Sequence, residues 1–163
     1  MKTRFVSFLL LSVLVAAGLS AQTKTSGTAT CKSDPASPPP VALTDQPNHS
    51  FAVGKAQCTW TGFEVAGAQY KDGTSTSLNE ITGETSSFNG YHVATMTNGD
   101  TTVAKFQGSG KMKDGKPASD GGTWSFTSGT GKAKGIKGKG TFKGTANADG
   151  SVTYKVDGEY SLP

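Results

Sequence analysis

The chain has 163 residues, of which 17% are charged and 22 are glycine, and its formal net charge is +4. This length suits one domain after removal of an N-terminal export signal. The charge is too small to indicate a nucleic acid as partner, and two histidines far apart in sequence do not suggest a metal site.

Residues 1–21 have the pattern of a secretory signal peptide. Basic residues precede an apolar run over 5–19, and small residues follow it. The run is shorter than the roughly 20 residues that cross a membrane. We therefore expect cleavage after Ala21, or alternatively after Gly18, and an exported, periplasmic or extracellular protein without a membrane span. Loss of the two basic residues lowers the formal charge from +4 to +2.

Residues 22–50 are rich in Pro, Ser and Thr, which predicts an extended arm before the folded domain. The arm contains Cys31, and the only other cysteine, Cys58, follows in the domain. In an oxidising compartment the two are expected to form a disulfide, whose loop contributes about 3 to 4 kcal/mol of stability on the chain-entropy treatment. Two unpaired thiols are the alternative, because sequence spacing alone does not establish the geometry.

The pattern of residues 51–163 predicts an all-β domain. Short runs of Val, Thr, Tyr, Phe and Trp are separated by Gly, Asn and Asp, and no stretch has apolar residues at helical spacing. Before a C-terminal hairpin, strands are expected over 55–66, 76–88 (a broken segment), 91–97, 101–113 and 123–127. About seven or eight such strands suit a meander of hairpins.

The C-terminal hairpin is the clearest prediction. Residues 134–146 and 151–162 both alternate between two kinds of side chain with the period of a half-buried strand. Between them, the sequence Asn-Ala-Asp-Gly is a type I turn that ends with Gly150 at a left-handed bulge position. This turn places Gly144 opposite Tyr154, so that an aromatic ring covers the inward glycine.

Only 24 of the residues from 51 to 163 are large and apolar or aromatic, which is a thin supply for a two-sheet sandwich. A small closed barrel of about eight antiparallel strands uses this supply better, because inward glycines let rings pack closely or leave a cavity. The expected inward side chains share even numbering: Phe106, Trp124, Phe126, Phe142, Tyr154 and Val156. With Trp60, they include the candidate contacts for a ligand: Trp60, Phe106, Trp124, Phe126 and Tyr154.

A family resemblance covers about a third of the exported chain. The motif GGTWSFTSGTGK at residues 121–132, followed by GIKGKGTFKG at 135–144 and by the tail from Asp149, resembles a pattern in small exported bacterial proteins of unassigned function. The resemblance implies an eight-stranded barrel, similar to the barrels of allene oxide cyclases and dirigent proteins. None of the catalytic residues of those barrels is matched here, so the resemblance implies no activity.

Candidate catalytic residues are few. Glu64 and His92 could face the interior. Along a strand, even-numbered residues lie on one face, so Glu64 shares a face with Trp60 and His92 shares one with Met96. A bulge at Gly62 would instead turn Glu64 outward and bring its apolar neighbours inside. His92 could equally be a half-exposed strand residue.

The basic C-terminal half suggests binding of a polyanion as one hypothesis. A run of its lysines lies at 132, 134, 137, 139 and 143. No phosphate-loop motif accompanies them, and Phe142 points to the face opposite the strand lysines, so a solvated outer face is the simpler interpretation.

Three functions remain open at this point. The first is a noncatalytic barrel that binds a small, partly apolar ligand or an envelope component. The second is an isomerase or cyclase that uses an interior carboxylate, and the third is binding of anionic surface polymers through the lysine face. No cofactor is expected for any of them.

Overall fold

The computed structural model describes residues 22–113 and 116–163, so the expected signal peptide lies outside the described residues. The described chain is almost entirely β-structure, as the alternating sequence predicts. Its elements are β1 (Thr23–Ser33), β2 (Val41–Ala42), β3 (His49–Thr61), β4 (Glu64–Val65), β5 (Ala68–Thr82), β6 (Thr85–Met96), β7 (Thr101–Lys113), β8 (Lys116–Gly129), the 3-10 helix η1 (Gly131–Ala133), β9 (Lys137–Ala146) and β10 (Val152–Ser161). Across these ranges, none of the helical structure has the length and apolar character needed to cross a membrane.

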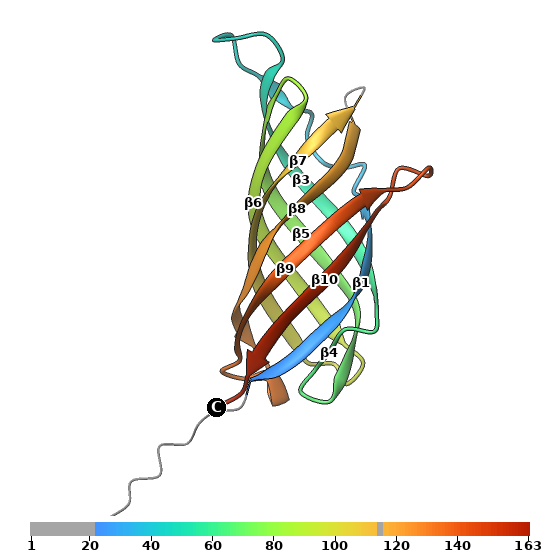
Figure 1. Ribbon diagram of the computed structural model, residues 1–163, viewed down its shortest axis with the longest axis vertical. Helices are drawn as coiled ribbons and strands as arrows, with labels where there is room; N and C mark the ends of the chain where they lie inside the picture. The colour runs from blue at the N-terminus through green and yellow to red at the C-terminus, as the bar shows by residue number, and fades with distance from the viewer. Residues whose placement is uncertain (1–21, 114–115) are drawn as a thin grey trace, which may run out of the picture.

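Eight of the strands close into an antiparallel barrel (Figure 1). Strands β5 to β10 pair in sequence order, β1 pairs with both β10 and β3, and β3 pairs with β5 to complete the ring. The two-residue strands β2 and β4 pair only with β3 and β5. The prediction of a small closed barrel is confirmed, and closure leaves little strand edge free for pairing with other chains.

The barrel begins at Thr23, well before the boundary at Phe51 expected from composition. β1 is extended, as the arm was expected to be, but it forms hydrogen-bonded ladders with β10 and β3. Its inward positions are occupied by small residues, and at Gly27 the space for a side chain is already filled. A Cβ atom on Gly27 would lie 2.5 Å from the backbone nitrogen of Phe63.

The C-terminal hairpin has the predicted register. Gly144 pairs with Tyr154, and Gly150 adopts a positive φ of 82° in the turn. β9 begins at Lys137 rather than Lys134, because η1 and a left-handed Gly135 (φ 78°) occupy the preceding residues.

The end of the barrel where the C-terminus lies (Figure 1) is here called the closed end, because buried side chains gather near it. Residues 62–67 turn inward there, aided by a positive φ of 78° at Gly62. The Thr25 hydroxyl donates a hydrogen bond to the Glu64 carbonyl (2.8 Å), and the Ala66 N–H donates to the Tyr160 hydroxyl (3.1 Å). The buried side chains near this end are Phe63, Val65, Ala68, Tyr70, Met96, Ala133, Ile136 and Tyr160.

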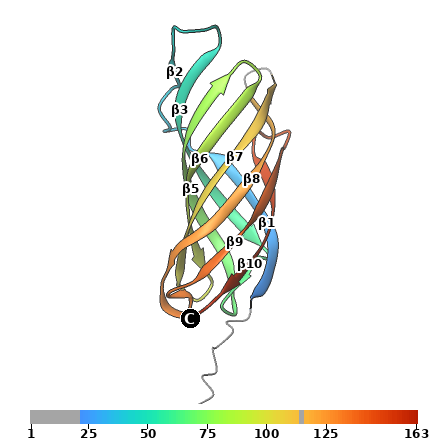
Figure 2. The same cartoon turned by 60° about the vertical axis from the view of Figure 1, so that its left-hand side comes forward.

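At the opposite end, the hairpins β2–β3 and β5–β6 project beyond the rest of the barrel (Figure 2). This is the open end. Between the two ends, the six even-numbered side chains expected to form one core do so. Trp124, Phe126, Phe142 and Val156 are buried, and Phe106 and Tyr154 are partly buried and pack against them.

A cavity inside the barrel as the candidate ligand site

The barrel encloses a cavity of about 400 Å³, within the range of small-molecule sites. Its lining reaches the open end, where it includes Ser33, Ile81 and Pro117. Most of the wall is apolar or aromatic. The lining rings are Trp60, Phe63, Tyr70, Phe88, Phe106, Trp124, Phe126, Phe142 and Tyr154. All five sequence-predicted ligand-contact residues therefore line this cavity.

Inward glycines make room for these rings. A Cβ atom on Gly122 would lie 2.8 Å from Cζ of Phe142, and one on Gly108 would lie 2.8 Å from Cζ of Phe88. The rings therefore lie against glycine positions of neighbouring strands. This arrangement concentrates aromatic surface on the wall and leaves space along the barrel axis.

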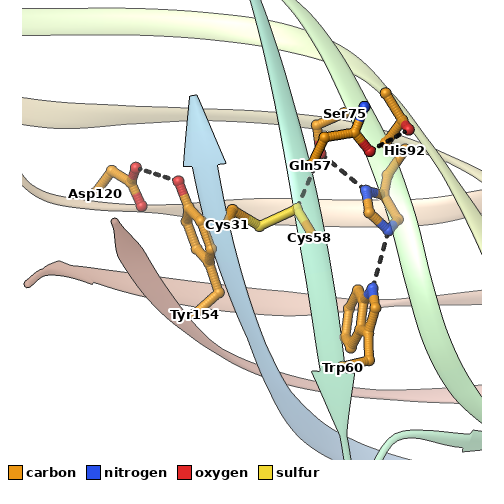
Figure 3. The surroundings of a disulfide bond; sticks show 9 residues. Cys31, Gln57, Cys58, Trp60, Ser75, His92, Asp120 and Tyr154 are labelled. Atoms are coloured by element: carbon orange, nitrogen blue, oxygen red, sulfur yellow. Dashed lines mark hydrogen bonds between the residues drawn. A yellow bond between two sulfur atoms is a disulfide. The ribbon is translucent and has the colours of Figure 1, made fainter. Parts of the chain in front are cut away.

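His92 of β6 lines this cavity, and Figure 3 shows its hydrogen bonds to Trp60 and Ser75. The Trp60 Nε1–H donates a hydrogen bond to His92 Nε2 (3.1 Å), and His92 Nδ1 lies 2.8 Å from Ser75 Oγ. Because an indole nitrogen can only donate, Nε2 must be unprotonated and the proton of the neutral ring must lie on Nδ1. Burial lowers the pKa of His92 to about 4, which keeps the ring neutral at physiological pH.

This tautomer excludes His92 as the base for Ser75. Nδ1–H donates to the Ser75 oxygen and so cannot accept the Ser75 proton, which a serine nucleophile would require. The Ser75 hydroxyl proton is left to point toward the weak acceptor Cys58 Sγ, 3.9 Å away, or toward a ligand in the cavity. Ser75 is thus a hydrogen-bond donor to the cavity.

A second polar group is formed by Asp120 of β8 and Tyr154 of β10. The Tyr154 hydroxyl donates to Asp120 Oδ2 (3.0 Å), whereas Asp120 Oδ1 is buried without a hydrogen-bond partner among the described residues. Burial raises the pKa of Asp120, and the hydrogen bond from Tyr154 opposes this rise only in part. Burial and the adjacent carboxylate also raise the pKa of Tyr154, so its hydroxyl remains a donor.

Gly144 of β9 allows this pair to form. It lies between Asp120 and Tyr154 in the sheet, since it is the register partner of both. A Cβ atom there would be 2.2 Å from Asp120 Oδ1 and 2.6 Å from Cε1 of Tyr154. Any side chain larger than hydrogen would separate the carboxyl from the hydroxyl.

The predicted disulfide is present. Cys31 of β1 and Cys58 of β3 are register partners with Cα atoms 4.0 Å apart, and the bond lies in the cavity wall (Figure 3). It links the N-terminal strand covalently to its neighbour in the ring.

The two weak catalytic candidates differ in position. His92 faces the cavity, but Glu64 is exposed and its carboxylate accepts a hydrogen bond from the Gln69 amide (2.8 Å). The inward placement of Glu64 is therefore wrong. The left-handed Gly62 exchanges the faces of the chain and brings Phe63 and Val65 inside, which is the alternative considered for this segment.

The interior carboxylate is instead Asp120, which the sequence analysis missed. Its even numbering matches Trp124, but the strand was expected to begin only at Thr123, after two glycines. The structure extends β8 back to Lys116, and these glycines lie within the strand.

The strand lysines at 137, 139 and 143 lie on the exposed outer face of β9. Lys139 is the register partner of Glu159, an acidic residue on the neighbouring strand β10. Within residues 22–113 and 116–163, no group of three or more His, Cys, Asp or Glu side chains is placed to hold a metal ion.

The fold and the cavity define this chain as a small antiparallel eight-stranded barrel with an accessible interior. Comparison with protein families and with curated protein sequences finds no match. Among solved structures, the barrel is similar to a protein of unknown function from the DUF3224 family of Shewanella oneidensis MR-1. The TM-score is 0.54 at 14% sequence identity, and the match covers 88% of this chain and 100% of that protein. At this identity the similarity shows a shared fold only.

Proposed function

We propose that this protein is an exported, noncatalytic β-barrel that binds a small, partly apolar ligand in its interior. The observation that carries the proposal is the cavity of about 400 Å³, which is lined by rings, reaches the open end and has a mainly apolar wall. Sites for small molecules commonly combine a mainly apolar wall with a few placed polar groups. The polar groups that line this cavity include the Ser75 hydroxyl and the Asp120 carboxyl.

The rigidity of the wall supports binding rather than collapse. The cavity is framed by eight strands in a closed ring, and the disulfide joins β1 to β3 in its wall. Rings that lie against inward glycines cannot move outward, because the backbone of the next strand is already in contact. The space is thus largely formed before a ligand arrives, which lowers the entropic cost of binding.

Native mass spectrometry of the protein isolated without denaturation from its own source tests this proposal. We expect a retained small molecule that dissociates on unfolding. Ala56→Phe fills part of the cavity from β3 and should abolish retention, whereas Gln57→Phe, on the exposed face of the same strand, should not. An apo mass for the wild-type protein, or equal retention by both variants, would contradict the proposal.

A second candidate function is an isomerase or cyclase that uses Asp120. The favouring observation is that a carboxyl with a raised pKa lies beside an apolar cavity and a tyrosine hydroxyl, as a general acid or base requires. A retained molecule that is converted by the wild-type protein but not by Asp120→Asn would favour this function, and one released unchanged by both would favour simple binding.

Export is part of the proposal and rests on the pattern of residues 1–21 and on the disulfide, which suits an oxidising compartment. N-terminal sequencing of protein recovered from the source cells should begin at Gln22, or alternatively at Leu19. An N-terminus at Met1 in the cytoplasmic fraction would contradict export.

A further inference from the structure

The polar and aromatic groups of the cavity are not evenly distributed. Asp120 is the one acidic residue among the described residues that line it. Of the lining bases, Lys55 and Lys111 are exposed, and His92 is held neutral by the hydrogen bond from Trp60. Among the described residues, no ion pair neutralises Asp120.

The carboxyl adjoins a contiguous set of rings, here called the aromatic cluster: Phe88, Phe106, Phe142 and Tyr154. Phe142 is central, with ring centroids 6.2 Å from Phe88, 6.3 Å from Phe106 and 5.9 Å from Tyr154. Tyr154 connects the cluster to Asp120 through its hydroxyl. The faces of aromatic rings carry partial negative charge and attract organic cations, most strongly where water is excluded.

On the side of β7 and β6, the neighbours of the carboxyl are small and close. Gly110 is the β7 register partner of Asp120, and Ser86 of β6 is the next residue in that row. A Cβ atom on Gly110 would lie 2.9 Å from Asp120 Cβ and 3.2 Å from Ser86 Oγ, so the glycine lets the two polar residues approach each other. Both residues line the cavity, where the carboxyl and the hydroxyl oxygen can accept hydrogen bonds from an ammonium group.

From this arrangement we infer that the ligand is an organic amine, with its ammonium group at Asp120 and its apolar body against the aromatic cluster. The inference rests on the proposed function and names the ligand class. An anionic ligand would meet no inward cation and would be repelled by the ionised carboxylate. A neutral ligand would leave the buried Asp120 Oδ1 without compensation, which is costly for a carboxylate.

Three probes of nearly equal shape test the inference: 2-phenylethylamine, 2-phenylethanol and phenylacetate, which are cationic, neutral and anionic at pH 7.5. Binding is measured by calorimetry on the disulfide-bonded protein. We expect the amine to bind at least about tenfold more tightly than the alcohol, which corresponds to one charge-assisted hydrogen bond. The anion should bind most weakly.

The matched variants are Asp120→Asn, in the cavity, and Asp157→Asn, on the exposed face of β10. Asparagine keeps an oxygen that can accept from Tyr154, so the fold should survive the first substitution. Asp120→Asn should remove the preference for the amine and leave alcohol binding within about threefold of the wild-type value, whereas Asp157→Asn should preserve the preference.

Equal binding of amine and alcohol, or a preference that survives Asp120→Asn, would overturn the inference and leave the proposed function standing. Failure of all three probes to bind would also overturn it. The proposed function is then judged separately, by retention of the native ligand in Ala56→Phe and Gln57→Phe.

Discussion

The neutral His92 inside the barrel predicts a specific loss of stability in acid. In the unfolded chain a histidine has a pKa of about 6.5, whereas burial lowers the folded-state pKa of His92 to about 4. Between these values the unfolded chain binds more protons than the folded protein. The free energy of unfolding therefore falls as the pH drops through this window and is unaffected by His92 above it.

The magnitude follows from the two pKa values. Lowering the pH from 7.5 to 5.0 should cost about 2 kcal/mol through His92, and lowering it below 4 should cost about 3 kcal/mol in all. These are upper bounds, because part of the ring faces the cavity and can be hydrated. His92→Gln removes the titration while its side-chain oxygen can still accept from Trp60, so this variant should lack the corresponding loss.

Guanidinium unfolding followed by tryptophan fluorescence at pH 7.5, 6.0, 5.0 and 4.0, with the disulfide intact, measures the difference between the two proteins. We expect the stability advantage of the wild-type protein over His92→Gln to shrink by about 2 kcal/mol between pH 7.5 and 5.0. Parallel pH dependences would show that folding does not lower the pKa of His92. The argument that the ring is buried in its neutral form would then be wrong.

Three further variants test other parts of the structure. Cys31→Ser combined with Cys58→Ser should lower the free energy of unfolding at neutral pH by about 3 kcal/mol, and a loss below about 1 kcal/mol would show that the loop entropy is unimportant. Gly144→Ala should cost about 1 to 3 kcal/mol because the new methyl group collides with Asp120 and Tyr154, and a neutral result would contradict the close approach of these residues. On the β2–β3 hairpin, His49 bonds the carboxylates of Glu80 (2.9 Å) and Asp45 (2.8 Å), and these bonds raise its pKa. The stability that His49 contributes should thus be present below pH 6.5 and lost as the pH rises through its raised folded-state pKa. The melting temperatures of the wild-type protein and of His49→Gln measure this contribution. A constant difference between them across this pH range would refute the prediction.

The C-terminal strands were predictable because their inward and outward residues alternate strictly. Residues 137–161 alternate cleanly around a turn with Gly at a left-handed position, so both strands and their register followed from the sequence. The strand expected over 101–113 coincides with β7. The first strand was not recognised, because its inward residues are Thr25, Gly27, Ala29 and Cys31. At Gly27 the space for a side chain is filled by Phe63, which is distant in sequence, and such a dependence on a remote residue leaves no local pattern.

The candidate site was predictable only in its apolar part. Parity along the strands placed Trp124 and Tyr154 inside, but it left the side of Glu64 open, and the left-handed Gly62 turns that residue outward. Asp120 was missed because Asp-Gly-Gly ordinarily marks a turn. In this barrel the two glycines lie within a strand, where they accommodate the rings of the cavity wall, and only the three-dimensional packing distinguishes the two roles.

The most direct test of the central claim is to locate a bound probe relative to the barrel wall. Intermolecular nuclear Overhauser effects between 2-phenylethylamine and the labelled protein would provide this location. The account predicts contacts from the probe to inward residues such as Ala56, Phe88 and Phe142, and none to Gln57 or Lys139 on the outer face. Contacts confined to the outer face, with no effect at the inward residues, would contradict a ligand site inside the barrel.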